Sequence, residues 1–180
     1  MLKSMICGAV LGVSCMVAGV AEAAIYIKIE GVDGESTRGG TGGWIALETL
    51  EQDMRTESSQ SGSARARASV DVGEIVVTKA FDRTSVALRD NLVKGRVFPK
   101  AEIVVTGMPG RAGQGGAGYS ILLEGARITG VSYSVGENGL GSEHVSFAYQ
   151  KITWKSGTYD AKTGAVKPGQ SASYDLKRGQ

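Results

Sequence analysis

The chain has 180 residues and a formal net charge of +2, with 42% of its residues hydrophobic and 21% charged. This length suits one domain with a sizeable core, and the near-neutral charge gives no reason to expect nucleic acid or an anionic membrane as a partner. The 27 glycines against 3 prolines favour many short strands joined by turns.

The N-terminus, residues 1–23, has the pattern of a signal peptide. A lysine precedes an apolar run over residues 5–20, and the small residues Ala21 and Ala23 form a cleavage site before Ala24. The run is short for a membrane-spanning helix, so a signal peptide is favoured over an uncleaved anchor or a lipoprotein. We expect an exported protein, secreted or periplasmic, with no stable membrane anchor; a misassigned start upstream of a cytoplasmic protein is the alternative.

Residues that carry chemistry are sparse in the mature chain. Cys7 and Cys15 lie in the leader, so disulfides and cysteine metal sites are not expected after cleavage. The only histidine, His144, alternates with Val145 and Phe147 along a predicted strand, which favours solvent or a subunit contact over catalysis. No metal-ligand spacing is present, and nothing specific supports a pair of catalytic carboxylates. We therefore expect no enzyme activity, no cofactor and no metal.

The first part of the mature chain predicts strands and a loop. Residues 24–32 alternate three isoleucines with polar side chains, which predicts a half-buried strand. Residues 33–43 are expected to form a flexible loop, because the GGTGG run lacks the Lys-Ser/Thr that follows in a phosphate-binding loop. Residues 44–50 predict a second strand, with a helix as the alternative on propensity.

Residues 52–68 are rich in Ser, Gly, Gln and Arg and have almost no apolar side chains. This composition predicts a long loop, and loops of this length in a compact domain are usually functional or disordered. Either a solvated loop or an intersubunit contact fits the segment. Its candidate subunit-contact residues are Arg55, Ser58, Ser59, Arg65 and Arg67.

Residues 70–105 predict a strand, a helix and a second strand. Residues 74–79 contain a β-branched run that suits a strand. Helix N-cap residue types and then apolar residues at helical spacing follow, namely Asp82, Thr84, Ser85, Leu88, Leu92 and Val93. Gly95 suits a helix C-terminus. Residues 98–99 (Phe-Pro) should prevent the helix from continuing, and residues 103–105 resume the strand pattern.

After an expected loop at residues 107–118, strand patterns occupy residues 119–124 and 126–135. They are separated by Gly125 and predict either a hairpin or one long bent strand. Residues 136–141 contain Asn-Gly, the strongest hairpin signal in the chain.

Residues 143–154 predict one long strand in which the apolar residues change phase after Tyr149. A bulge near residues 150–151 would keep both apolar sets buried. The remaining tail, residues 155–180, is expected to contain a short edge strand at residues 172–176.

Four segments carry a family resemblance: IYIKIEGVDGES, GWIALETL, EIVVTKAFDRTS and EHVSFAYQKITW, in this order. They are similar to successive strands and the helix of the Hcp family (hemolysin-coregulated proteins), the tube subunits of bacterial type VI secretion systems. The tail, with its closing YDLK, resembles an extension carried by one branch of that family. The resemblance covers nearly all of residues 24–180.

The resemblance implies a compact β-barrel of two antiparallel sheets with one α-helix packed on its side. It implies a single domain over residues 24–180, with residues 155–180 as a C-terminal extension. It also implies a homohexameric ring, stacked into a tube that a contractile sheath propels, with sheath, spike or small effector proteins as partners. Residues 52–68 fall where the family has an extended loop that reaches a neighbouring subunit or ring.

Two hypotheses for the function follow. The first is a non-enzymatic ring- or tube-forming protein that acts as an exported conduit or effector carrier. The second is an exported monomeric Hcp-like binding module at the periplasm or cell surface, because a chain exported by the general route could not join a cytoplasmic tube.

Overall fold

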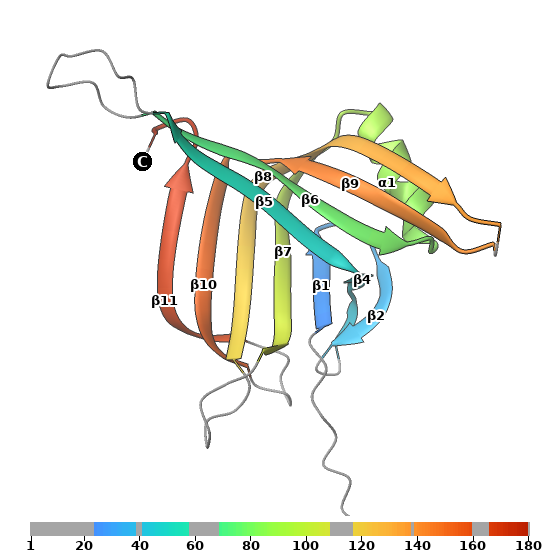
Figure 1. Ribbon diagram of the computed structural model, residues 1–180, viewed down its shortest axis with the longest axis horizontal. Coiled ribbons are helices and arrows are strands. Elements are labelled where there is room, and N and C mark those ends of the chain that lie inside the picture. The colour runs from blue at the N-terminus through green and yellow to red at the C-terminus, as the bar shows by residue number, and fades with distance from the viewer. Residues whose placement is uncertain are drawn as a thin grey trace, which may run out of the picture.

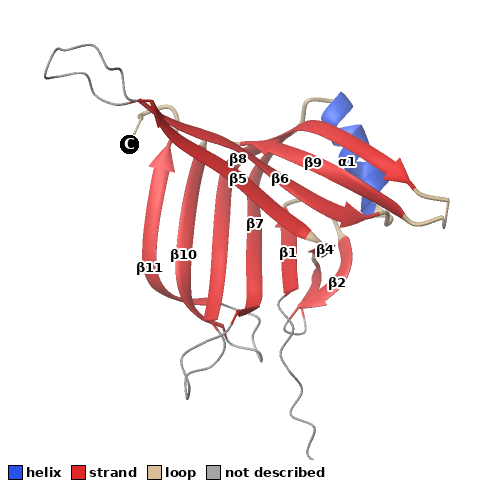
Figure 2. Cartoon of the chain, in the orientation of Figure 1, coloured by secondary structure: helices blue, strands red, loops and turns tan. Residues whose placement is uncertain are grey.

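The computed structural model describes residues 24–38, 41–57, 69–108, 117–137, 139–159 and 166–179. These residues form a mainly β structure, with one helix among them (Figures 1 and 2). No helix in this described part is long and apolar enough to cross a membrane. The predicted leader, including Ala21 and Ala23, lies outside the described residues, and Ala24 begins the first strand.

Nine strands form one antiparallel hydrogen-bonded sheet that folds over into two facing layers. The first layer has the order β4-β1-β7-β8-β10-β11. Its strands are β1 (Ala24–Ile29), β4 (Ile45–Leu47), β7 (Val97–Met108), β8 (Ala117–Val135), β10 (Lys151–Tyr159) and β11 (Val166–Asp175). The second layer contains the far half of β8 with β9 (Gly141–Ala148), β6 (Ser69–Ala80) and β5 (Thr49–Glu57), and crosses in front of the first in Figure 1. This confirms the predicted barrel-like fold.

Strand β8 belongs to both layers. Its first half pairs with β7 and β10, and from Arg127 onward it pairs with β9. Gly125 has a φ of 61°, a value that favours glycine, and the register with β9 shifts between Ile128 and Gly130. Of the two alternatives for this segment, the single bent strand is therefore right. The predicted hairpin at residues 136–141 joins β8 to β9, although residue 138 lies outside the described residues.

The prediction of one strand over residues 143–154 is wrong. Strand β9 ends at Ala148, and β10 begins at Lys151 in the other layer. Phe147 and Ile152 are both buried, so the change of apolar phase is real. Its cause is the passage of the chain between layers, which requires pairing partners that the local sequence does not specify.

The flexible loop predicted at residues 33–43 is also wrong. Here β2 (Gly34–Arg38) pairs with β3 (Thr41–Gly43) in a small separate sheet. Glycine permits a close approach, because a Cβ on Gly34 would lie 2.0 Å from the carbonyl oxygen of Trp44. The strand prediction for residues 44–50 is confirmed by β4 and the start of β5, and the helix alternative is wrong.

The predicted loop over residues 52–68 begins too early, whereas its end at residue 68 agrees with the start of β6. Strand β5 continues to Glu57 and β6 begins at Ser69, so only residues 58–68, which lie outside the described residues, remain for a connection. The polar composition of β5 reflects an exposed strand that pairs with β6 alone among the described strands. Two smaller limits also differ: β7 already includes residues 98–99, and β11 begins well before residue 172.

The helix α1 (Thr84–Val93) packs on one side of the barrel, next to β8. Leu88 joins it to the core, and Gly95, with a φ of 61°, ends it as predicted. The core consists of apolar side chains from both layers, among them Ile27, Ile75, Phe98, Ile103, Leu123, Val145, Phe147 and Ile152.

Candidate functional site

The most unusual feature of the interior is a cluster of charged groups where β6, β9 and α1 meet. Lys79 and Glu143 are paired in the strand register and are 1% and 0% exposed. The Lys79 Nζ donates to Glu143 Oε1 at 2.8 Å, and the Ser85 hydroxyl donates to the same oxygen at 2.6 Å. Nζ also lies 3.2 Å from Ser85 Oγ, so α1 is hydrogen-bonded to both strands through its first turn.

Asp82 connects this cluster to the start of the helix. Its Oδ1 accepts hydrogen bonds from the backbone N–H of Thr84 at 2.7 Å, from the Thr84 hydroxyl and from Lys79 Nζ at 2.9 Å. Burial raises the pKa of Asp82, but the bonds from Thr84 and Lys79 and the Lys79 charge outweigh it, so the pKa is lowered overall. Of the three predicted N-cap types, Asp82 therefore supplies the capping side chain.

Arg89 covers the outer side of Glu143. Its Nη2 lies 2.8 Å from Glu143 Oε2, an ion pair in which that oxygen accepts no well-aligned hydrogen bond. The guanidinium carbon lies 5.4 Å from the ring centre of Phe81 and 5.0 Å from that of Tyr133. The buried carboxylate thus has two cations, the buried Lys79 and the half-buried Arg89, whose guanidinium lies against two aromatic rings.

This charged cluster is suited to hold α1 on the barrel, not to meet a substrate. By residue type, Ser85 could be a nucleophile and Lys79 its base. Both side chains are buried, however, and the Ser85 hydroxyl is hydrogen-bonded to Glu143. The cluster escaped sequence reasoning, although one signal was present. Ile75, Val77 and Lys79 occupy every second position of one strand, so the strand periodicity of two places the lysine on the buried face.

His144 is exposed, as predicted, and its Nδ1 lies 2.9 Å from Thr78 Oγ1. Within the described ranges, no group of three His, Cys, Asp or Glu side chains could hold a metal ion. Of the candidate subunit contacts, Arg55 lies on β5 with its side chain 2.6 Å from Asp53. Ser58, Ser59, Arg65 and Arg67 lie outside the described residues, so a contact through this segment stays a prediction.

Exposed apolar side chains gather around α1 and the β8–β9 hairpin. Val93 and Val86 on the helix are 86% and 75% exposed, and Leu140 and Tyr133 belong to the hairpin. A second group of exposed side chains contains Met54 on β5, Val70 on β6 and Leu176 after β11. Sequence reasoning did not select any of them as surface residues.

Residues 26–156 match the family described as Type VI secretion system effector, Hcp. The chain belongs to the Hcp family. It is therefore a structural protein of type VI secretion, of the tube or effector-carrier kind. The match ends at residue 156, so almost all of the predicted C-terminal extension lies beyond it.

Solved Hcp structures share this fold. Hcp1 from Salmonella typhimurium is 22% identical, with a TM-score of 0.65 over 87% of this chain and 96% of that one. A structure described as a type six secretion system protein is 23% identical, with a TM-score of 0.69 over 88% and 99%. The secreted protein Hcp3 from Pseudomonas aeruginosa is 20% identical, with a TM-score of 0.57 over 85% and 96%. A comparison with curated protein sequences finds no match.

Proposed function

We propose that the mature chain assembles with copies of itself into a ring of six subunits, and that such rings form a conduit or carrier for exported proteins. The observation that carries this proposal is the match of residues 26–156 to the Hcp family. The same family points to sheath, spike or small effector proteins as the other partners.

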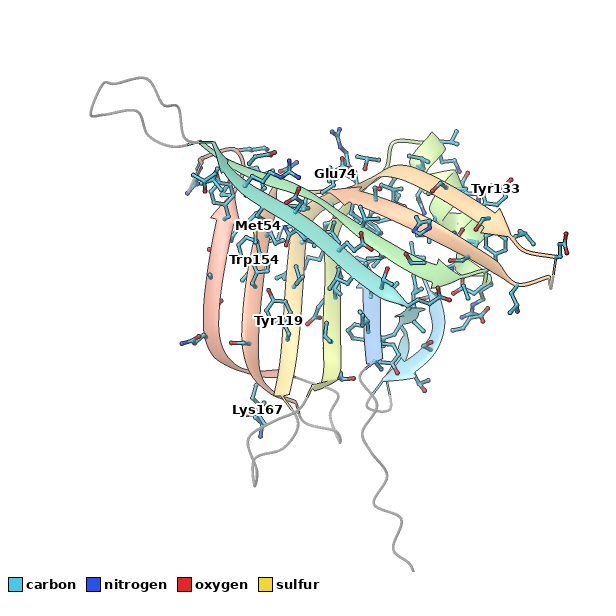
Figure 3. The ribbon with its side chains drawn as sticks, in the orientation of Figure 1. Met54, Glu74, Tyr119, Tyr133, Trp154 and Lys167 are labelled. Atoms are coloured by element: carbon cyan, nitrogen blue, oxygen red, sulfur yellow. The ribbon has the colours of Figure 1, made fainter. Side chains whose placement is uncertain are left out.

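The exposed apolar side chains support association of the chain with itself. Tyr133 and Met54, one from each exposed group, lie toward opposite ends of the layer formed by β5, β6 and β9 (Figure 3). Exposed apolar groups of this kind mark interaction sites. Two different surfaces, on opposite ends of one subunit, suit a head-to-tail contact that closes into a ring.

The proposal includes an exported, non-enzymatic protein. Cleavage between Ala23 and Ala24 would release the chain to the periplasm or the medium, as the leader pattern indicates. The absence of an accessible nucleophile in the charged cluster supports a structural role, because Ser85 is only 5% exposed.

The assembly of residues 24–180 tests the proposal by light scattering and negative-stain imaging. We expect a mass several times that of one chain and ring-shaped particles. Val93→Glu should lower the mass without changing the circular dichroism spectrum, because it places a charge in an apolar contact. The control Glu102→Lys changes an exposed charge on β7 and should leave the mass unchanged.

A monomer at all concentrations would reject the ring and favour an exported monomeric binding module. The leader is the observation that favours this second function, because a chain that leaves by the general route does not meet a cytoplasmic apparatus.

A further inference from the structure

An open groove lies on the inner face of the first layer, where β5 no longer covers β8, β10 and β11 (Figure 3). It has a volume of about 540 Å³. We call it the aromatic groove, and it is lined by Tyr119, Trp154, Ser156, Gln170, Ser171 and Ala172. No charged side chain is among these residues.

The strand register builds the aromatic groove. Tyr119 on β8 is opposite Ser156 on β10, which is opposite Gln170 on β11. In the adjacent row, Trp154 is opposite Ala172. Because side chains alternate along a strand, these residues share one face. The small side chain of Ala172 leaves open space beside the indole.

The indole of Trp154 is fixed from the opposite layer. Its Nε1 donates to Gln52 Oε1 at 3.1 Å, and Gln52 Nε2 donates to the Tyr149 hydroxyl at 2.8 Å. That hydroxyl donates to the carbonyl oxygen of Gly73 at 2.7 Å. Such a chain of hydrogen bonds holds a half-buried ring in one orientation, so its exposed face is presented without an ordering cost on binding.

Tyr119 adds a second ring and a free polar group. Its hydroxyl makes no hydrogen bond to any described residue, while its ring packs against the core. A tyrosine phenol is neutral at neutral pH and can donate, and burial raises the pKa of Tyr119 further. Together with the Ser156 hydroxyl and the Gln170 amide, it surrounds the apolar surface with uncharged donors and acceptors.

We propose that the aromatic groove binds a neutral saccharide of about two rings, a size that its volume accommodates. Sugar rings combine apolar C–H faces, which pack on aromatic rings, with hydroxyl edges that hydrogen-bond to amides and hydroxyls. An ionic ligand would find no opposite charge among the described lining residues. A purely apolar ligand would leave Ser156, Gln170 and Tyr119 without partners.

An extended peptide fits less well. Peptides that add to a sheet bond to the backbone of an edge strand, whereas Tyr119, Trp154 and Ser156 lie on β8 and β10, which are both paired on their two sides. The proposed export would bring the groove to the compartments where cell-envelope saccharides occur.

Tryptophan fluorescence of the mature chain, residues 24–180, tests the assignment with chitobiose, cellobiose and maltose as probes. Trp44 is buried, so a ligand-induced change in emission reports Trp154. We expect at least one sugar to bind with a dissociation constant of about 1 mM or tighter. No change in emission and no calorimetric heat with any of the three would overturn the proposal.

Two matched variants locate the binding. Ala172→Leu fills the space beside Trp154, whereas the control Ser173→Leu adds the same side chain at the next position, on the opposite face of β11. We expect the first to weaken binding at least about tenfold and the second to leave it unchanged.

Tyr119→Phe removes only a hydroxyl, so it tests the binding site even if Ala172→Leu perturbs the fold. We expect Tyr119→Phe to weaken sugar binding severalfold. Equal affinities for the Ala172 and Ser173 variants, or unchanged affinity in Tyr119→Phe, would refute the site. Displacement of the sugar by an uncharged extended peptide would assign the groove to a protein partner instead. The result does not depend on ring formation, because light scattering on the same samples reports the assembly state separately.

Discussion

Lys79→Met should destabilise the protein strongly, although the substitution keeps most of the volume of the side chain. The Lys79 ammonium has acceptors within hydrogen-bond distance on Ala80, Asp82, Ser85 and Glu143. A lysine ammonium has three protons to donate, so each proton has an acceptor at this site. Without the ammonium, Asp82 and Glu143 lose the cation that they share, and the half-buried Arg89 is the cation left at Glu143.

Breaking a buried ion pair by removing one partner costs about 3–5 kcal/mol. For a domain of this size each kcal/mol lowers the melting temperature by about 2–4 °C, so a decrease of about 10 °C is expected. Urea unfolding of residues 24–180, followed by circular dichroism at neutral pH, measures the change in free energy directly. Ring formation would add a concentration dependence, so the variants are compared at one protein concentration.

The control is Lys151→Met, the same substitution in a partly exposed pair whose Nζ lies 3.2 Å from Glu124 Oε2. Exposed pairs contribute about 0–1 kcal/mol, so this variant should be close to the wild type. In the double variant Lys79→Met/Glu143→Gln the loss should be smaller than the sum of the two single losses. Equal costs for Lys79→Met and Lys151→Met, or strict additivity in the double variant, would refute the assigned role of the charged cluster.

Three further predictions follow from the fold. Because the pKa of Asp82 is lower in the folded than in the unfolded protein, its carboxylate stabilises the folded state at pH values above its unfolded pKa of about 3.9, and this contribution is lost as the pH falls through the folded pKa. Asp82→Asn should therefore weaken the decrease of the unfolding free energy with falling pH, measured by urea unfolding at several acidic pH values. An unchanged pH dependence would contradict this. Gly34→Ala should cost about 1–3 kcal/mol in thermal unfolding because its Cβ meets the backbone of Trp44, whereas Gly42→Ala, with open space around it, should be nearly neutral; similar losses would disprove the close-packing argument. N-terminal sequencing of exported protein should begin at Ala24, and an intact leader on exported protein would reject cleavage there.

Local signals in the sequence predict much of this fold. The helix was recognisable from Asp82 at its start and Gly95 at its end, because capping depends on residues within one turn. The β8–β9 hairpin followed from Asn-Gly for the same reason. The mainly β class followed from the alternating apolar pattern and the glycine content.

Features that depend on distant partners were missed. The break between β9 and β10 occurs because the two strands belong to different layers, while the local pattern indicates only a change of phase. The Lys79–Glu143 pair joins residues 64 positions apart, and only the register of β6 with β9 brings them together. The composition of the polar strand β5 predicts a loop, because it reflects an exposed edge strand whose partner β6 lies elsewhere in the chain.

The assembly state of the mature chain, residues 24–180, tests the central claim most directly. Light scattering at several protein concentrations should give a mass several times that of one chain, with six the expected number of subunits. A strictly monomeric mass at the highest concentration would contradict the proposed ring.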